Sequence, residues 1–387
     1  MNIVPANRIS EVEEYYFSIK LKEIEKLRSE GANIINLGIG NPDLPPSKST
    51  IDTLTAEANK TNPGNHGYQS YVGIPELRNA FASWYKKYFK VDLNGANEIL
   101  PLIGSKEGIM HISMAFVNEG DEVLVPNPGY PTYSSVSKLV GAKIRYYDLK
   151  EELNWQPNFE ALESEDLSKV KIMWVNYPNM PTGARATMEL FEKLVAFGKR
   201  HNILIVNDNP YSFVLNNEQL SILAVKDAKD VAIELNSLSK SGNLSGWRIG
   251  MVGAKKEFID YILRVKSNMD SGMFRPLQVA AAQTLALPDE WYLTNNAIYT
   301  ERRDVVFKIM DLLKCQYDKN QVGLFVWAKI PETIESSKIL TDKILYEKHV
   351  FITPGMIFGS AGEKYIRISL CTSKELLIEA LERIKRI

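Results

Sequence analysis

The strongest constraint on the fold is an alternation of short apolar runs with amphipathic helical segments between residues 98 and 235. Runs this apolar are typical of strands that are buried on both faces. The pattern therefore predicts an α/β fold with a mostly parallel central sheet and helices on each side. Strands are predicted at residues 98–103, 122–125, 143–147, 171–175, 203–206 and 231–235. Helices between them are predicted at residues 105–116 and 187–200.

The rest of the chain predicts a second, smaller domain. A chain of 387 residues exceeds the usual size of one hydrophobic core. Pro45 and Pro46 interrupt regular structure near one end, and a long helix over residues 291–313 begins the other. The remainder mixes strands (324–330 and 365–370) with a closing helix. We expect a large domain at residues 45–288 and a small α+β domain made of residues 1–44 and 289–387.

Charge and composition exclude several classes of partner. Lys plus Arg number 46 against 47 for Asp plus Glu, so nothing indicates nucleic acid or an anionic membrane. No run of about 18 apolar residues and no signal-peptide pattern is present, which predicts a soluble, non-exported protein. Cys315 and Cys371 are far apart without metal-ligand spacing, so neither a disulfide framework nor a metal site is expected. A reducing cytoplasm fits best.

One segment, residues 237–250, is a candidate covalent site. It places Lys240 among serine and glycine residues, where a ligand could approach the amine closely. Ser237, Ser239 and Arg248 in the same segment could bind a phosphate. The alternative is a solvated loop that carries one of the chain's many lysines.

Two further segments follow predicted strands and could bind a flat, phosphorylated ligand. Gly104, Ser105 and Lys106 begin a helix, whose free N–H groups and dipole favour phosphate, although a glycine turn before a helix is common. Tyr130 lies on a turn between prolines and could stack on a ring. A buried core tyrosine is the more frequent explanation of such a residue.

Two more segments place polar side chains at strand ends. Prolines on both sides of Asn179 fix the backbone so that an amide can point at one place. Asp208 and Tyr211 end a wholly apolar strand, and a carboxylate there needs a partner such as a protonated ring nitrogen. Open α/β sheets bind ligands at the carboxyl ends of their parallel strands, so these segments should converge.

A glycine pair near the amino terminus is not a dinucleotide fingerprint. Gly38 and Gly40 lack the third glycine, and Pro42 stands where a helix should begin. A close backbone approach to a ligand at Gly40 and a plain turn both explain the pair.

Taken in order, these segments resemble one enzyme family. The phosphate loop, aromatic turn, Asn-Pro loop, Asp208-x-x-Tyr211 and the lysine segment resemble the fold-type I aminotransferases that use pyridoxal 5'-phosphate. This is class I/II, the aspartate aminotransferase family, and the resemblance runs from about residue 33 to the C-terminus. Residues 7–17 and 38–43 look like the branch that contains LL-diaminopimelate aminotransferases and other prokaryotic enzymes of mixed specificity.

The resemblance implies roles for the candidate residues. It implies that Lys240 forms a Schiff base with the cofactor aldehyde and moves the proton between the substrate α-carbon and the cofactor. Asp208 would pair with the ring nitrogen, Tyr211 would donate to the ring 3'-oxygen, and Tyr130 would stack on the ring. The residues implied at the phosphate are Gly104, Ser105, Lys106, Ser237, Ser239 and Arg248.

The resemblance also implies substrates, a partner and a reaction. Arg367 matches the arginine that grips the substrate α-carboxylate, and Gly40 matches the backbone that closes over it. Tyr68 matches a tyrosine lent to the neighbouring subunit's phosphate, which implies a homodimer, although an ordinary loop tyrosine would explain it too. The implied reaction moves the amino group of an L-amino acid to a 2-oxo acid by a ping-pong mechanism.

One position departs from the family pattern. Many relatives have an asparagine immediately before Pro-Thr-Gly, whereas this chain has Met180 there and Asn179 one place earlier. A thioether cannot donate a hydrogen bond to the ring oxygen. Either Asn179 takes that role or Tyr211 carries it alone.

Two other activities and the substrate class stay open at this point. A lyase or cyclopropane-forming synthase could use the same fold and cofactor, and a regulator could use the fold to sense an amino acid. Acidic, aromatic and aliphatic amino acids are not distinguished. Four residues could lie near the substrate side chain, although a position on the surface or beside the cofactor is the more common explanation for each: Lys106, Asn243, Asn268 and Arg275.

Overall fold

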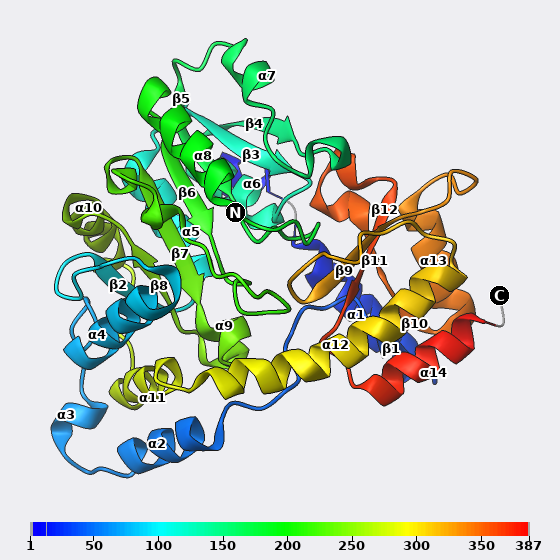
Figure 1. Cartoon of the computed structure of the whole chain (residues 1–387), viewed down its shortest axis with the longest axis horizontal. Coiled ribbons are helices and arrows are strands. Elements are labelled where there is room, and N and C mark those ends of the chain that lie inside the picture. The colour runs from blue at the N-terminus through cyan, green and yellow to red at the C-terminus, as the bar shows by residue number, and fades with distance from the viewer. Residues whose placement is uncertain (1–2, 13, 386–387) are drawn as a thin grey trace.

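A seven-stranded mixed sheet forms the centre of the larger part of the molecule (Figure 1). The computed structural model describes residues 3–12 and 14–385. The strand order is β2-β8-β7-β6-β5-β3-β4, and all neighbouring pairs are parallel except those that involve β8. The predicted fold class, a mostly parallel α/β sheet flanked by helices, is confirmed. The bounds are β2 Ile99–Leu102, β3 Glu122–Asn127, β4 Lys143–Asp148, β5 Val170–Val175, β6 Leu204–Asp208, β7 Ala232–Ser237 and β8 Gly250–Gly253.

Strand β8 is the one strand of this sheet that the sequence pattern did not predict. It has four residues, and two of them are glycines, so it carries neither the length nor the β-branched character of its neighbours. It lies antiparallel between β2 and β7, with Gly250 opposite Ser237. The antiparallel pairing of β7 with β8 places Arg248 beside the segment that contains Lys240.

Helices cover both faces of the sheet (Figure 1). One hydrophobic cluster packs one face against α4, α8 and α11, and another packs the opposite face against α5, α6 and α10. The bounds are α4 Pro75–Trp84, α8 Met188–His201, α11 Arg275–Leu285, α5 Ser105–Phe116, α6 Pro131–Leu139 and α10 Lys256–Lys266. Shorter or peripheral helices are α2 Lys48–Ala58, α3 Pro63–His66, α7 Phe159–Glu163 and α9 Leu238–Ser241.

Helix α8 illustrates how the sequence sets these elements. Thr187 caps its first turn by accepting a hydrogen bond from the N–H of Leu190 at 3.1 Å. Leu190, Leu194 and Val195 recur at helical spacing and are buried against the sheet. Asn202 then ends the helix in the left-handed conformation, so the chain can turn directly into β6.

A further hydrophobic cluster combines both ends of the chain. Ile24 and Leu37 from the N-terminal part pack with residues such as Ile344, Ile366 and Leu377. Its sheets are β11-β12-β9, which is antiparallel, and the parallel pair β1-β10. The bounds are α1 Tyr16–Ser29, β1 Ile35–Asn36, α12 Asp289–Leu312, β9 Phe325–Lys329, α13 Ser337–Lys348, β10 Val350–Phe351, β11 Thr353–Pro354, β12 Tyr365–Ser369 and α14 Lys374–Ile384. Residues 1, 2, 13, 386 and 387, which the predicted small domain includes, lie outside the described residues.

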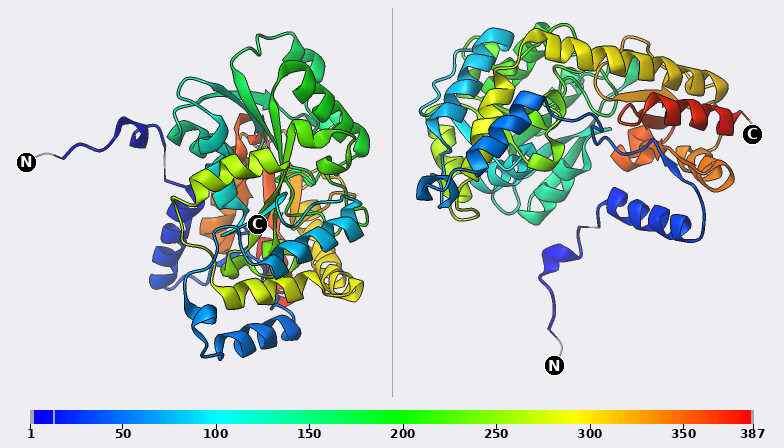
Figure 2. Two further views of the ribbon diagram at one scale, coloured as in Figure 1. Left: turned by 90° about the vertical axis from the view of Figure 1, so that its left-hand side faces the viewer. Right: turned by 90° about the horizontal axis from the view of Figure 1, so that it is seen from below.

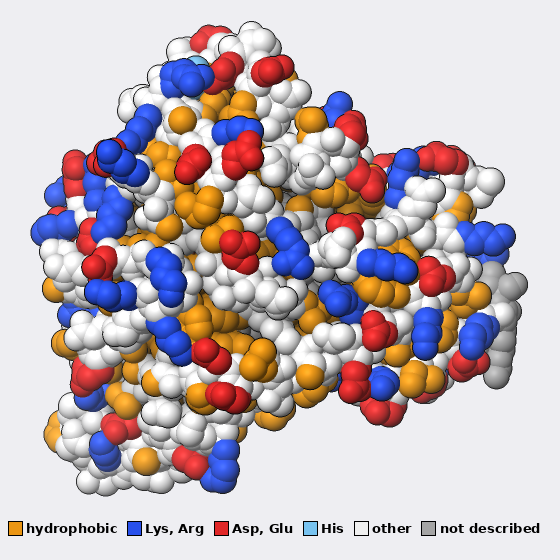
Figure 3. Space-filling view, viewed as in Figure 1, with side chains coloured by type: hydrophobic (Ala, Val, Ile, Leu, Met, Phe, Trp, Pro, Cys, Tyr) orange, Lys and Arg blue, Asp and Glu red, His pale blue; other side chains and the backbone are white. Residues whose placement is uncertain are grey.

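The surface shows no extended region of one charge on the face in Figure 3, where acidic and basic side chains are interspersed. Figure 2 shows the N-terminal segment extending away from the body of the molecule. Ile3 and Val4 in this segment are 90% and 80% exposed. In the described part of the chain, every helix is too short or too polar to span a bilayer.

Candidate active site

A cavity of about 680 Å³ lies where the two parts of the chain meet, past the carboxyl ends of the parallel strands. It is lined by the end of β6, the segment around α9, the start of α5 and strand β12. Most of the predicted site residues line it together. These are Gly40, Ser105, Lys106, Tyr130, Asp208, Tyr211, Ser237, Ser239, Lys240, Arg248 and Arg367.

Lys240 lies in the short helix α9, which directly follows β7. Ser237 caps this helix through a hydrogen bond from the N–H of Ser239 at 3.2 Å. The Lys240 amine donates to the carbonyl of Gly40 at 2.5 Å, which joins the site to the N-terminal part of the chain. Burial lowers the pKa of Lys240, so the neutral, nucleophilic form of its amine is favoured.

Asp208 has one carboxylate oxygen free for a ligand. It ends β6 and is 5% exposed, and its Oδ2 accepts a hydrogen bond from the Tyr133 hydroxyl at 2.9 Å. Its buried Oδ1 has no hydrogen-bond partner among the described residues. A buried carboxylate with an open acceptor fits a protonated ring nitrogen, so this position suits the pyridine ring of pyridoxal phosphate.

Burial raises the pKa of Asp208 from 3.8 to about 7, which makes the stability of the cofactor-free protein depend on pH. Between these values the native state holds a proton that the unfolded chain has released. Relative to an Asp208→Asn variant, the free energy of unfolding should therefore fall by up to about 4 kcal/mol as pH rises through this range. Urea unfolding of both proteins at a series of pH values measures the difference, and a constant difference would contradict the assignment.

The phosphate-sized end of the cavity is lined by Ser105 and Arg248, and Gly104 lies next to the Arg248 guanidinium outside the lining. Gly104 precedes α5 with φ +80°, and a Cβ atom there would lie 2.1 Å from the Arg248 Nη2. Only glycine therefore lets the guanidinium approach this turn. The first N–H groups of α5 have no acceptor within the helix. Together with the Arg248 guanidinium and the hydroxyls of Ser237 and Ser239, they fit a phosphate dianion.

Two tyrosines face the space between Asp208 and the chain ends. Tyr130 precedes α6, and its ring packs edge-on against Tyr133 at 5.5 Å between centroids. Tyr211 is buried beside Phe325. Burial raises the pKa of both hydroxyls, so each stays protonated and can donate a hydrogen bond.

Arg367 is a buried cation without an acidic partner among the described residues. It lies on β12, 4% exposed, and donates to the Gly38 carbonyl at 2.9 Å and to the Met180 sulfur at 3.3 Å. Its guanidinium carbon lies 3.8 Å from the ring centroid of Phe325. The Nε is buried without a partner, and burial lowers the pKa to about 10. A cation held in this way fits a substrate carboxylate.

Three predicted residues, Gly104, Asn179 and Tyr68, are not part of the cavity lining of this chain. Asn179 is buried in its own loop, where it donates to the Asn176 carbonyl at 3.1 Å and accepts from the Thr182 hydroxyl at 2.7 Å. Met180, and not Asn179, faces the cavity, because Asn179 is turned inward by these bonds. Tyr68 lies on the surface and is 93% exposed.

Three of the four candidates for the substrate side chain also lie outside the cavity lining. Asn243 is 6% exposed and donates to the Pro45 carbonyl at 3.2 Å. Arg275 pairs with Glu76 at 3.0 Å, and Asn268 donates to the Arg264 carbonyl at 2.7 Å. Only Lys106 of this group lines the cavity.

Sequence reasoning missed several lining residues. Tyr133 was overlooked although it lies three positions after Tyr130, at helical spacing, and it stacks on Trp174 with centroids 5.1 Å apart. Tyr15 and Phe17, at the start of α1, close one side of the cavity. Nothing in the local sequence of α1 indicated this, because its position depends on the packing of both chain ends. The other missed residues are Ser18, Leu21, Ile39, Asn176, Met180, Pro210, Ser245, Phe325 and Phe358.

Known proteins resemble this chain over its whole length. Residues 32–384 match the family model described as aminotransferase class I and II. LL-diaminopimelate aminotransferase of Maridesulfovibrio salexigens is 42% identical, covering 99% of this chain and 98% of the relative. The enzyme of the same name from Aquifex aeolicus is 40% identical over 99% and 98%.

Solved structures agree. The substrate-bound BacF structure from Bacillus subtilis superimposes with a TM-score of 0.94 at 36% identity, covering 100% of this chain and 98% of that one. The structure of an aminotransferase from Staphylococcus aureus superimposes with a TM-score of 0.89 at 29% identity, covering 99% of this chain and 98% of that one. These matches favour neither the lyase or synthase nor the regulator alternative. The chain therefore belongs to the class I and II aminotransferases, the pyridoxal-phosphate-dependent enzymes of fold type I.

Proposed function

We propose that this enzyme takes the amino group from LL-diaminopimelate and passes it to a 2-oxo acid. The observation that carries the proposal is the similarity, at about 40% identity over nearly the whole chain, to enzymes named LL-diaminopimelate aminotransferase. The cavity supports it: the resemblance implies Lys106 at the phosphate, but Arg248 and the N–H groups at the start of α5 would hold that group, which leaves the Lys106 amine as a further cation in the lining. A donor that carries a second carboxylate at its far end would use that cation.

The cavity residues would hold the cofactor and the substrate in one orientation. When bound, pyridoxal phosphate supplies an aldehyde and an electron-accepting ring. Asp208 would hold the ring nitrogen, and Arg248 with the start of α5 would hold the phosphate. The neutral Nζ of Lys240 accepts the proton from the substrate α-carbon. Arg367 binds the α-carboxylate and so fixes which C–H bond faces Lys240.

We also propose that the two chain ends, residues 1–44 and 289–387, move as a small domain that closes over the substrate. Lys240 donates to the carbonyl of Gly40, and Arg367 donates to the carbonyl of Gly38. A bound substrate that displaced both hydrogen bonds would release the same short segment, residues 38–40. Closure would exclude water from the reacting carbon.

Lys106 provides a test of the substrate. Its amine lies 4.9 Å from the ring centroid of Tyr15, and burial lowers its pKa. Lys106→Gln should raise the KM for LL-diaminopimelate by roughly tenfold or more, because a charged hydrogen bond to the distal carboxylate is lost. In steady-state kinetics of this variant, kcat should be nearly unchanged. The KM for leucine, which has no distal carboxylate, should also be nearly unchanged.

A matched control and a competing substrate sharpen this test. The Lys255 amine also lies over an aromatic ring, 4.2 Å from the centroid of Phe258, but Lys255 is not part of the cavity lining. Lys255→Gln should therefore change neither the KM for LL-diaminopimelate nor the KM for leucine. The aromatic lining, including Tyr15, Phe17 and Phe358, favours phenylalanine as a second donor. If phenylalanine has a higher kcat/KM than LL-diaminopimelate, the substrate proposal fails and an aromatic aminotransferase replaces it.

We propose that two copies of the chain form a homodimer in which Tyr68 reaches the phosphate site of the other copy. Other exposed apolar side chains lie near Tyr68, one in the same segment and two on the neighbouring loop. They are Tyr71, Met269 and Phe274, which are 44%, 59% and 40% exposed. Exposed apolar side chains on neighbouring loops are typical of an interface. The apolar N-terminal residues Ile3 and Val4 would also be covered by a second copy.

Removing the Tyr68 hydroxyl tests the shared site. Tyr68→Phe should weaken pyridoxal phosphate binding by about tenfold, the value of one hydrogen bond to a charged group. The affinity is measured by fluorescence titration of the cofactor-free protein. Tyr146→Phe, an exposed tyrosine on β4, is the matched control and should have no effect. Equal affinity in both variants, or a monomer by sedimentation, would contradict the shared site.

We propose a cytoplasmic location for the enzyme. Its two cysteines, Cys315 and Cys371, are both free and buried, as a reducing compartment would leave them. An amino-acid biosynthetic enzyme also works where its 2-oxo acid acceptors are produced. Fractionation of cells with an antibody to the protein would test this.

A further inference from the structure

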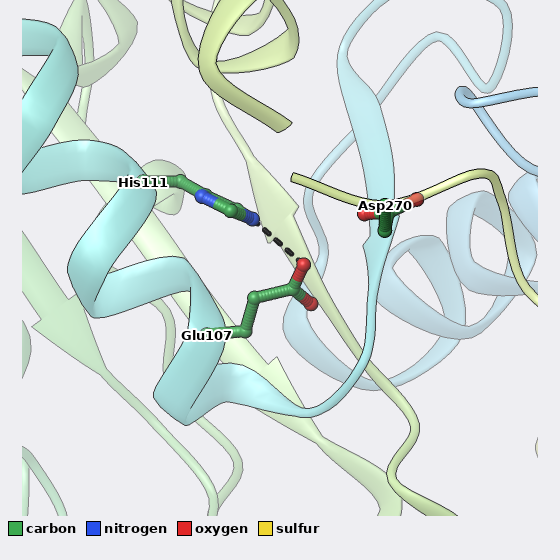
Figure 4. Close-up of side chains that lie close together, drawn as sticks. All are labelled: Glu107, His111 and Asp270. Carbon is green, nitrogen blue, oxygen red and sulfur yellow. Dashed lines mark hydrogen bonds and ion pairs between the residues drawn. The ribbon is translucent and has the colours of Figure 1, made fainter. Parts of the chain in front are cut away.

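A group of charged side chains lies next to the phosphate turn and is not used in the proposed reaction (Figure 4). Glu107 and His111 lie one turn apart on α5, and Asp270 faces them from the loop after α10. The His111 Nε2 is 2.7 Å from the Glu107 Oε1, and the donor atoms of all three residues lie within 4.8 Å of one another. The Lys266 amine donates to both oxygens of Asp270 at 2.7 and 2.9 Å.

The chemistry of this group fits a hydrogen-bonded network better than a cation site. A histidine that binds a metal usually donates its second N–H to an acceptor. The Nδ1 of His111 is buried and has no partner among the described residues, so the ring interacts through its Nε2, which donates to the Glu107 carboxylate. Asp270 already accepts from Lys266 and from the N–H of Gly272.

Glu107 connects the network to the phosphate turn. Its Oε2 accepts a hydrogen bond from the N–H of Ile103, the residue before Gly104. Gly104 has a positive φ and leaves no room for a Cβ atom beside the Arg248 guanidinium, so the turn is closely packed there. Fixing the N–H of Ile103 therefore fixes the direction of the free N–H groups at residues 105–106.

Asp270 connects the network to the loop that carries Tyr68. Its carboxylate holds the N–H of Gly272, whose φ is +84°. A Cβ atom on Gly272 would lie 2.5 Å from the carbonyl oxygen of Gln69, so this loop packs directly on the backbone beside Tyr68. The same network thus contacts the cofactor turn and the surface proposed for the second subunit.

We propose that His111 is a positioning residue for the cofactor phosphate. By holding Glu107 beside Asp270, it keeps residues 103–106 in the shape that presents free N–H groups to the phosphate. Asp270, whose carboxylate lies within 4.8 Å of the Glu107 and His111 donor atoms, brings the loop beside Tyr68 close to that turn. This inference rests on the proposed function, because it requires the turn to bind a phosphate.

The test compares ligands with and without the phosphate, using the full chain freed of cofactor. His111→Leu should weaken pyridoxal 5'-phosphate binding by about tenfold or more and leave the affinity for pyridoxal unchanged. His111→Gln, whose Nε2 can still donate to Glu107, should bind both ligands nearly as the wild type does. The matched control is Asp260→Asn, which breaks the exposed Lys256–Asp260 ion pair. This pair has the same i,i+4 spacing as Lys266–Asp270, and the variant should bind both ligands as the wild type does.

Three results would overturn the inference: wild-type phosphate affinity in a folded His111→Leu variant, an equal loss for pyridoxal, or a loss in His111→Gln as large as in His111→Leu. If His111→Leu does not fold, the nearly isosteric Glu107→Gln must show the same phosphate-selective loss. Failure of the wild type to bind pyridoxal 5'-phosphate would overturn the proposed function itself, and that result is visible without any variant.

Discussion

Replacing Lys240 with alanine should lower kcat for amino-group transfer by about 10⁴-fold, because the variant has no group that can move the α-proton. The Lys240 amine is buried in the cavity, and burial favours its neutral form. The other lining lysine, Lys106, lies over the Tyr15 ring at 4.9 Å. Single-turnover assays with the reconstituted variant measure the loss.

A small amine distinguishes loss of the proton acceptor from loss of the fold. The variant leaves a space the size of the lysine side chain, and methylamine in solution should restore part of the rate in proportion to its concentration. Circular dichroism should show an unchanged fold. Activity within tenfold of the wild type would contradict the role of Lys240.

Replacing Arg367 with glutamine should lower kcat/KM by about 10³-fold, since truncating one partner of a buried, hydrogen-bonded charge pair costs several kcal/mol. The guanidinium carbon lies 3.8 Å from the ring centroid of Phe325 and 4.6 Å from that of Phe358, and the side chain is buried. It therefore cannot move to solvent to find another partner. Arg367→Lys should recover only part of the activity, because lysine lacks the bidentate fork.

The matched control for this prediction changes the substrate. An amine analogue of the donor, which lacks the α-carboxylate, should react slowly and at the same rate with wild type and Arg367→Gln. If the variant also loses most of its rate with the analogue, Arg367 acts on the fold or the cofactor and not on the carboxylate.

The centre of the fold and most of the cavity were predictable because they depend on local sequence. Strand β6 is apolar from Leu204 to Val206, and the polar side chains at its end and just after β7 can only lie at the carboxyl edge of a parallel sheet. Asp208 and Lys240 were therefore placed together from the sequence alone.

What could not be predicted depends on contacts between distant segments. Strand β8 is too short and too rich in glycine to stand out, and only its pairing with β2 and β7 forms it. Tyr15 and Phe17 reach the cavity because both chain ends share one hydrophobic cluster. Asp270 meets His111 across more than a hundred residues, a distance over which no spacing rule operates.

The most direct test of the account is a half-reaction. The enzyme loaded with pyridoxal phosphate is mixed with LL-diaminopimelate in the absence of any 2-oxo acid, and the products are counted per active site. Amino-group transfer predicts one equivalent of the oxo product, no free ammonia, and an amino group that stays with the protein-bound cofactor until a 2-oxo acid is added. Continued release of ammonia without an acceptor would show a lyase and contradict amino-group transfer.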